Sequence, residues 1–385
     1  MPGPAKPFVL SAPAVFDGGS FLHDHCVVIE GASIKHVLPI ADCPAGLESV
    51  ALKQGTLAPG FIDLQVNGGG GVLFNNTPEC DTLRTMQAAH RSCGTTGIVP
   101  TFLSDTAEMQ QRAVAAVREA LQTGAAGILG LHLEGPFFNP ARCGAHSAAM
   151  VREPTDDDIA WLCSLQDVPL LLTLAPEQLP LENLAQLASS GIILCAGHTQ
   201  ASFEQMKAAS SAGLSGVTHL FNAMQASSAR EPGTVGAALG SDQLWAGIIA
   251  DGHHVHPENI RQAHAAKPVG KLLLVSDAMA TVGSNESTFE LYGETIHASG
   301  GRLVNAQGKL AGSAIGLMQA VAFASSTVNL PLEECLRMAS LYPATVLGLQ
   351  HQQGKIKEGY RADLVHFDEQ FTVHHTWLAG QHQQH

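Results

Sequence analysis

Eight apolar segments, each bounded by glycine or proline, recur through the middle of this 385-residue chain. Their hydrophobicity is continuous rather than alternating, which is typical of strands buried on both faces of a parallel sheet. Helix-compatible stretches, such as residues 81–91 and 107–121, lie between several of them. Eight strands alternating with helices predict an α/β fold, a (β/α)8 TIM-like barrel. The segments are residues 60–68, 96–103, 126–135, 169–176, 191–198, 215–222, 244–252 and 271–278.

An open, doubly wound parallel sheet is the alternative arrangement of such strands. It has less support, because no GxGxxG sequence follows an early strand. Residues 284–312 interrupt the regular alternation with glycine-rich, strand-like sequence. We interpret them as an insertion after the eighth strand, a hairpin that reaches over the mouth of the barrel.

Both ends of the chain read as short β segments, at residues 8–12, 25–30, 33–38, 354–368 and 371–380. We therefore predict a small β-sandwich domain formed from both chain termini, with residues 1–57 as its N-terminal part and residues 349–385 as its C-terminal part. The (β/α)8 barrel then covers residues 58–348. Two unrelated appendages are the alternative.

Composition limits the possible partners. The formal net charge of −14 argues against nucleic acid, which requires a surplus of Lys and Arg. A small anionic substrate would need a local cationic pocket. We see neither a signal peptide nor an apolar run that could span a membrane. The eight cysteines form no CxxC pair, and we expect a reduced, cytoplasmic setting.

Polar side chains gather where the predicted barrel strands end, which is the edge at which TIM barrels carry their active sites. One such residue is ordinary, because helix N-termini favour Asp. Here several strands share the feature, so we predict an active site at this rim. The residues are His132, Glu134, His198, His219, Asn222, Asp251, His253, His254 and Asp277.

Three of these residues form a metal-binding set. Glu134, His198 and His219 supply one carboxylate and two imidazoles, which suit a divalent transition metal. Three protein ligands leave a position open for water, as catalytic sites do. Asp277, on the final strand, is placed to accept the proton of that water and deliver it to a leaving amine.

Nine short motifs, taken in order, make nearly the whole chain resemble the amidohydrolase superfamily and, within it, the N-acetylglucosamine-6-phosphate deacetylases. The resemblance implies a metal-dependent hydrolase that converts N-acetyl-D-glucosamine 6-phosphate to D-glucosamine 6-phosphate and acetate. The motifs are residues 58–68 (APGFIDLQVNG), 130–137 (GLHLEGPF), 141–146 (ARCGAH), 196–199 (AGHT), 218–224 (THLFNAM), 230–237 (REPGTVGA), 250–255 (ADGHHV), 275–279 (VSDAM) and 309–314 (KLAGSA).

The resemblance also interprets two amides on the first barrel strand, Gln65 and Asn67. Amides are poor ligands for a zinc-like ion, and many metal-dependent hydrolases carry histidines at these positions. Family members with QxN there hold a single metal. The resemblance thus implies one divalent ion per subunit, with zinc expected and iron(II) or another transition metal as alternatives.

Further site residues follow from the resemblance alone. It implies a phosphosugar substrate, no nucleic-acid or membrane partner, and a homodimer in which Arg230 reaches the neighbouring subunit's site. An arginine can form a forked contact with phosphate, and histidines can donate further hydrogen bonds. The implied substrate-binding residues are Gln65, Ala145, His146, Asn222, Ala223, Arg230, Asp251, His254, Leu310, Ala311 and Gly312.

Two other functions compete with this interpretation. The same barrel could act on another acylated amine or a cyclic amide, but such a substrate would not require Arg230 and His146. It could also be a non-catalytic barrel that binds sugar phosphates. The complete set of Glu134, two histidines and Asp277 argues against that second alternative.

Overall fold

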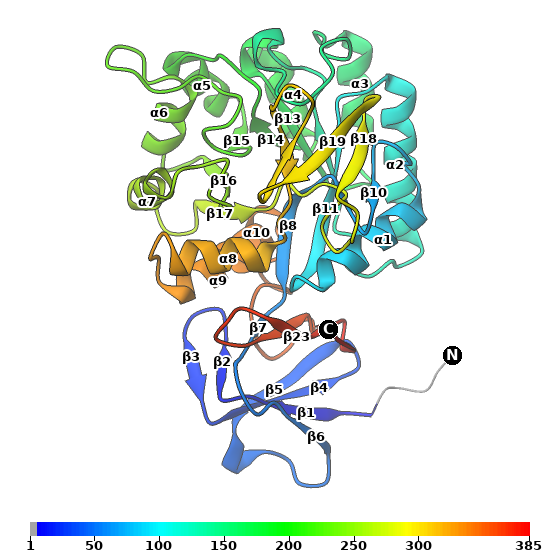
Figure 1. The fold of residues 1–385 in the computed structure, drawn as a ribbon, viewed down its shortest axis with the longest axis vertical. Helices are drawn as coiled ribbons and strands as arrows, with labels where there is room; N and C mark the ends of the chain where they lie inside the picture. Colours follow the sequence, from blue (N-terminus) through cyan, green and yellow to red (C-terminus); the bar gives the residue numbers. More distant parts are fainter. Residues whose placement is uncertain (1–5) are drawn as a thin grey trace.

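The eight predicted segments form one parallel sheet in the computed structural model, which describes residues 6–385 (Figure 1). Side chains on both faces of these strands are buried, because the barrel interior covers one face and helices cover the other. The strands are β8 (Phe61–Val66), β11 (Thr95–Leu103), β12 (Leu131–Glu134), β13 (Leu170–Leu174), β14 (Ile193–Ala196), β15 (Leu214–Val217), β16 (Trp245–Ile249) and β17 (Leu272–Val275).

The sheet closes on itself, which excludes the open, doubly wound arrangement. A parallel bridge joins Val66, at the end of β8, to Ala278, just after β17. The Asn67 N–H donates to the Ala278 carbonyl at 2.8 Å, and the Asp277 N–H donates to the Gln65 carbonyl at 3.0 Å. The first and last strands of the barrel are therefore joined beside the predicted catalytic carboxylate.

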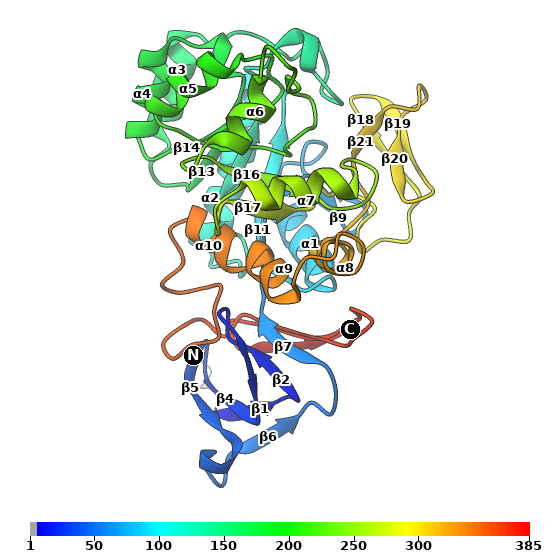
Figure 2. The same cartoon turned by 90° about the vertical axis from the view of Figure 1, so that its left-hand side faces the viewer.

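Helices surround the barrel and cover its outer face (Figures 1 and 2). Each carries an apolar stripe, and in α2 the N-cap Thr106 side chain accepts the Met109 N–H. No helix within residues 6–385 is both long and apolar enough to cross a membrane. The helices are α1 (Cys80–Arg91), α2 (Ala107–Gln122), α3 (Asp156–Ser164), α4 (Leu181–Ser189), α5 (Phe203–Ser211), α6 (Gly233–Gly240), α7 (Pro257–Ala266), α8 (Leu317–Ser326), α9 (Leu332–Ala339) and α10 (Leu341–Val346).

Both chain ends contribute to a small β domain beside the barrel, as predicted (Figure 1). One sheet joins β7, β2 and β3 from the first part of the chain to three strands from the last part. A second sheet packs against it around Leu10, Val27 and Trp377. The strands are β1 (Phe8–Ser11), β2 (Ala14–Phe16), β3 (Phe21–His23), β4 (His25–Glu30), β5 (Ser33–Pro39), β6 (Glu48–Ala51), β7 (Thr56–Pro59), β22 (Leu364–Phe367), β23 (Val373–Leu378) and β24 (Gln381–Gln384).

The predicted insertion is a four-stranded antiparallel sheet rather than a single hairpin. Figure 2 shows it standing out from one side of the barrel. Its own apolar cluster, which includes Phe289, Leu291 and Leu303, packs on Met279 beside the last barrel strand. Its strands are β18 (Thr288–Leu291), β19 (Glu294–Ser299), β20 (Arg302–Val304) and β21 (Leu310–Ser313), and a short ribbon of β9 (Gly68–Gly69) and β10 (Val72–Leu73) follows β8.

Candidate metal centre and active-site cavity

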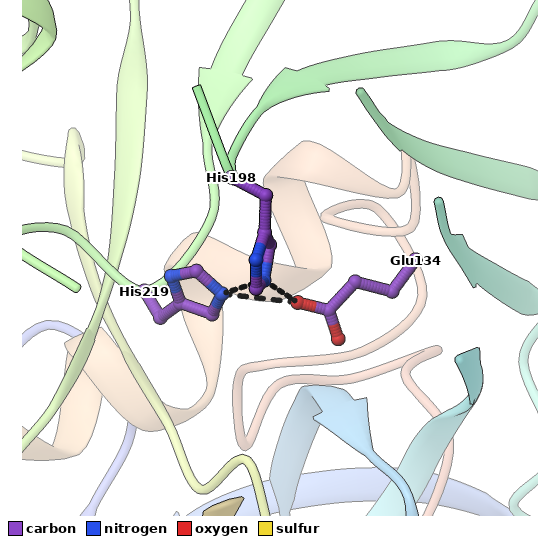
Figure 3. A group of neighbouring side chains, drawn as sticks. All are labelled: Glu134, His198 and His219. Atoms are coloured by element: carbon purple, nitrogen blue, oxygen red, sulfur yellow. Dashed lines mark hydrogen bonds and ion pairs between the residues drawn. The ribbon is translucent and has the colours of Figure 1, made fainter. Parts of the chain in front are cut away.

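Three side chains from neighbouring strand ends converge at the rim of the barrel (Figure 3). Glu134 ends β12, while His198 and His219 each follow their strand by two residues. The Glu134 Oε1 atom lies 3.3 Å from His198 Nε2 and 3.0 Å from His219 Nε2, and the two Nε2 atoms lie 3.1 Å apart. All three residues are buried, so water does not separate these atoms.

The proton positions around this cluster favour a cation at its centre. His198 Nδ1 donates its hydrogen to the Arg142 carbonyl at 2.8 Å, which leaves a lone pair on Nε2. That lone pair faces the Glu134 carboxylate, which also only accepts. His219 Nδ1 is buried without a partner among residues 6–385. One carboxylate and two imidazoles with converging lone pairs fit a divalent transition metal.

The ionisation of the cluster agrees with this fit. Burial raises the pKa of Glu134, but the contacts of its carboxylate with both imidazoles outweigh burial and hold that pKa well below its usual range. Burial lowers the pKa of His198. Burial also lowers the pKa of His219, but the contact with Glu134 outweighs it and raises the pKa overall. An ionised carboxylate therefore faces positions that protons or a metal can fill.

The two amides of the first strand hold the acidic residues in place. Asn67 Nδ2 donates to Asp277 Oδ1 at 2.7 Å. Gln65 Nε2 lies 3.2 Å from the same oxygen and 3.1 Å from Glu134 Oε2, so it bridges both carboxylates. Burial and the negative charge of Glu134 raise the pKa of Asp277 to about 6. Gln65 and Asn67 thus position the carboxylates of the site by donating hydrogen bonds to them.

Strained backbone accompanies these side chains. His198, His219 and Asp277 have φ values of 50°, 31° and 52°, in the left-handed region that residues other than glycine rarely adopt. Such conformations cost about 1–3 kcal/mol each and persist where the surrounding structure enforces them. Both histidines of the cluster and the half-buried Asp277 carboxylate are therefore held by the barrel rather than by local preference.

The cluster opens into a cavity of about 410 Å³. Its wall includes all three residues of the cluster and Asp277. It also brings together seven of the predicted substrate-binding residues, namely Ala145, His146, Asn222, Ala223, His254, Leu310 and Gly312. The structure therefore brings these predicted residues together in one cavity at the rim of the barrel.

Four predicted residues do not line this cavity: Gln65, Arg230, Asp251 and Ala311. Asp251 lies behind His254 and accepts the proton of its Nδ1 at 2.6 Å. Ala311 lines a neighbouring cavity of about 280 Å³. Arg230 is exposed on the loop after β15, away from the cavity wall of its own chain. The substrate-binding roles of all eleven residues stay predictions.

The sequence analysis missed two cationic residues on the cavity wall, Arg142 and Lys309. Arg142 acts partly through its backbone carbonyl, which any residue type could supply. Lys309 stands at the start of the KLAGSA motif, directly before three predicted binding residues. Its place in this motif was the only feature of the sequence that could have indicated Lys309 as a residue of the cavity wall.

Models of two families match the chain, the amidohydrolase family over residues 56–382 and the NagA composite domain over residues 8–57. The first match spans more than half of the chain and contains every residue of the cavity wall. The chain belongs to the amidohydrolase family. The residues that match the composite domain, 8–57, contain the N-terminal strands of the small β domain.

Individual members of the family are similar over almost their entire length. An N-acetylgalactosamine-6-phosphate deacetylase of Shewanella is 43% identical, with 94% of this chain and 92% of that protein covered. An N-acetylglucosamine-6-phosphate deacetylase of Haemophilus influenzae is 37% identical, with 93% and 94% covered. A crystal structure of the Pasteurella multocida N-acetylglucosamine-6-phosphate deacetylase superposes with a TM-score of 0.96 at 35% identity, with 98% and 100% covered.

Proposed function

We propose that this amidohydrolase is a metal-dependent N-acetylglucosamine-6-phosphate deacetylase. Water cleaves the N-acetyl amide of N-acetyl-D-glucosamine 6-phosphate and gives D-glucosamine 6-phosphate and acetate. The proposal rests on the convergence of the Glu134–His198–His219 cluster and Asp277 on one cavity. It draws its substrate from the relatives, since the chain is 37% identical to the Haemophilus influenzae enzyme. A cavity of about 410 Å³ lies in the size range of small-molecule sites.

Glu134, His198 and His219 would hold one divalent ion. When bound, the ion supplies Lewis acidity that polarises the amide carbonyl and lowers the pKa of water. Zinc is the proposed ion, with iron(II) or another transition metal as alternatives. Within residues 6–385 no second cluster of three metal-binding side chains exists, and Gln65 and Asn67 turn their amide N–H groups toward carboxylates. We therefore propose one ion per chain.

Asp277 is the proposed general base and general acid. Both first-strand amides donate to its Oδ1 atom, which leaves Oδ2 to take a proton. That oxygen would accept the proton of the attacking water and return it to the leaving amine nitrogen. A pKa of about 6 suits a carboxyl group that must bind and release a proton near neutral pH.

Two histidines would orient the substrate. His146 Nδ1 accepts the Ser104 N–H at 3.2 Å, so the ring carries its hydrogen on Nε2. Burial lowers the pKa of His146 well below its usual range, which keeps it a neutral donor for an oxygen of the substrate. His254 is oriented by Asp251 through the opposite edge of its ring. Both side chains face the cavity that would hold the sugar.

Arg230 would serve the neighbouring subunit of a homodimer. It is exposed and makes no ion pair within residues 6–385, and it lies on the loop after β15, in which Asn222 and Ala223 line the cavity. A guanidinium suits forked binding of phosphate. An arginine can reach a partner's site only if it is exposed and lies outside the site of its own chain. Arg230 meets both conditions.

The cellular setting is proposed from the thiols. All eight cysteines are free thiols, and five of them are buried inside the protein. Proteins of oxidising compartments commonly carry disulfides, whereas cytoplasmic proteins keep their thiols reduced. The cytoplasm is therefore the proposed location.

N-acetyl-D-galactosamine 6-phosphate is a second candidate substrate. The observation that favours it is the 43% identity to the Shewanella enzyme, which is named for that sugar. The two sugars differ only in the configuration at one hydroxyl-bearing carbon. The amide and the phosphate, which the cluster and the cationic groups would bind, are shared.

Acetate release and metal content test the proposal together. Purified protein, made without added metal, should contain about one divalent ion per chain. It should release acetate from at least one of the two 6-phosphates, and a chelator should abolish this activity until metal is restored. The unphosphorylated sugars, other N-acyl amines and cyclic amides are the comparison substrates.

Three results would contradict the proposal. Faster turnover of cyclic amides or other N-acyl amines would support the alternative amidohydrolase function. Tight binding of the 6-phosphates without acetate release, in metal-loaded protein, would indicate a non-catalytic barrel. Two tightly held ions per chain would contradict the single site.

A further inference from the structure

One wall of the catalytic cavity lies outside the barrel. It is formed by the end of the turn after β20 and by β21, where Lys309, Leu310 and Gly312 line the cavity. The Ser313 N–H donates to the Asp277 carbonyl at 2.8 Å, and Ser313 pairs with Ala278. The inserted sheet is therefore fixed to the same segment that carries the proposed catalytic base.

Lys309 is a cation on this wall without an acceptor. Its N–H donates to Asn305 Oδ1 at 3.0 Å, and its carbonyl accepts the Asn305 N–H at 3.1 Å. These bonds fix its backbone. Its ammonium group makes no hydrogen bond or ion pair in the part of the chain that the structure describes, residues 6–385. The side chain is exposed and lines the cavity, so it is available to a ligand.

Arg142 is the other lysine or arginine on the cavity wall, and it is already engaged. Its Nη2 donates to Gln225 Oε1 at 3.2 Å. Its carbonyl accepts the His198 Nδ1 hydrogen, so its backbone belongs to the metal site. Arg142 Nε is buried without a partner among residues 6–385, so this guanidinium is only partly paired. Lys309 is the cation of this wall whose charged group is exposed and makes no contact with an acceptor in the described residues.

The surroundings of Lys309 indicate on which side it would bind an anion. The lysine separates the catalytic cavity from the neighbouring one of about 280 Å³. That second cavity contains the carboxylate of Glu294, which accepts a hydrogen bond from Asn305 Nδ2 at 3.2 Å. A carboxylate repels a phosphate dianion, so Glu294 disfavours an anion in the second cavity. The catalytic cavity also has two carboxylates, but there Glu134 contacts His198 and His219, and Asp277 accepts a hydrogen bond from Asn67.

We propose that Lys309 binds the substrate phosphate directly, which makes the inserted β18–β21 sheet the anion-recognising wall of the active site. The inference rests on the proposed function, since only a phosphorylated substrate needs this cation. An ammonium group and a phosphate form a charge-assisted hydrogen bond. Lys309 lies on the same chain as the metal ligands, so each subunit discriminates phosphorylated sugars even without the neighbour's Arg230.

The test compares Lys309→Met, Lys309→Arg and Lys207→Met with wild-type protein loaded with metal. Lys207 is an exposed lysine on α5 away from the cavity, which makes it the matched control. Acetate release is measured on both 6-phosphates and on the two unphosphorylated sugars. Calorimetric binding of D-glucosamine 6-phosphate and D-glucosamine is measured in parallel, so a readout exists even if no substrate turns over.

Lys309→Met should raise KM for the 6-phosphates about 10- to 150-fold, the range expected for one charged hydrogen bond, with kcat nearly unchanged. Unphosphorylated sugars should be unaffected, Lys309→Arg should retain most of the binding, and Lys207→Met should match the wild type. Equal losses on both substrate classes, or none, would overturn the role of Lys309. Wild-type protein that binds D-glucosamine 6-phosphate through Lys309 but releases no acetate would overturn only the proposed deacetylation.

Discussion

At the scale of single residues, a substitution of Asp277 is the most direct test of the proposed chemistry. Asp277→Asn keeps the size of the side chain and an oxygen that can accept the Asn67 hydrogen bond. It removes the capacity to take a proton from water, so kcat should fall by roughly two to four orders of magnitude. Steady-state acetate release, with metal content and the thermal unfolding midpoint as controls, gives the measurement.

A variant with near wild-type turnover would remove Asp277 from the mechanism. A variant that loses its metal or its fold would show instead that the carboxylate supports the site. Gln65 lies against both Asp277 and Glu134, so any change in metal affinity should also be compared with Gln65→Leu.

The sequence predicted the residues of the buried cluster better than the residues that hold them. Glu134, His198 and His219 were predictable because barrel strands end at one rim, whatever the details of packing. Arg142 was not, because its contact with His198 uses a carbonyl that every residue has. Lys309 was not, because hydrophobic periodicity does not say where an insertion packs on a barrel.

At the scale of elements, the start of α3 links helix stability to the cavity wall. Asp158 completes a capping box with Thr155 and forms a bidentate ion pair with Arg152, with distances of 2.6 and 2.7 Å. The Arg152 N–H in turn donates to the Pro136 carbonyl at 3.1 Å, at the start of the segment that carries Arg142. Replacing Asp158 by a neutral residue should therefore destabilise both α3 and the segment that carries Arg142.

Asp158→Asn should lower the free energy of unfolding by about 1 kcal/mol at pH 7, a value discounted for partial exposure of the pair. Burial opposes ionisation of Asp158, but the bonds with Arg152 and Thr155 outweigh it and lower its pKa to about 2. A lowered carboxyl pKa stabilises the protein above the unfolded-state value, about 4, and this contribution is lost as the pH falls toward 2.

Thermal unfolding between pH 7 and pH 3 checks this sign, with the exposed neighbour Asp157→Asn as control. The deficit of Asp158→Asn should shrink as the medium becomes more acidic, while Asp157→Asn should stay close to the wild type throughout. A deficit that grew on acidification would show that the ion pair does not stabilise the folded state.

Element prediction was reliable where hydrophobic runs were long. All eight barrel strands appear where continuous apolar segments stand, because strands buried on both faces need them. The insertion is less regular: β18 alternates exposed and buried residues, whereas β19 is exposed at every position except Ile296. Their number and pairing depend on contacts with Met279 and its neighbours, which no local pattern encodes. The domain boundaries at residues 57/58 and 348/349 stay predictions.

At the scale of the whole molecule, Arg230 tests the proposed dimer. Arg230→Ala should lower kcat/KM on the 6-phosphate about 10- to 150-fold and leave the unphosphorylated sugar unaffected. Mixing inactive Asp277→Asn with Arg230→Ala protein should then restore activity. With random pairing half of the dimers are mixed and each has one complete site, so about one quarter of wild-type activity should return.

Size-exclusion chromatography and a labelled subunit must first confirm that the chains exchange. If exchange is complete and no activity returns, Arg230 does not act across subunits. If Arg230→Ala affects both sugars equally, the arginine supports the loop after β15 rather than the phosphate.

The closure of the barrel also determines when a growing chain becomes an enzyme. All three metal-facing side chains have been synthesised once residue 219 is complete, yet Asp277 and the strand that joins Gln65 and Asn67 come almost sixty residues later. The proposed metal ligands and the proposed base therefore come together only when residues 65–67 pair with residues 277–278. A chain that ends before residue 277 should release no acetate, because the two ends of the barrel have not met.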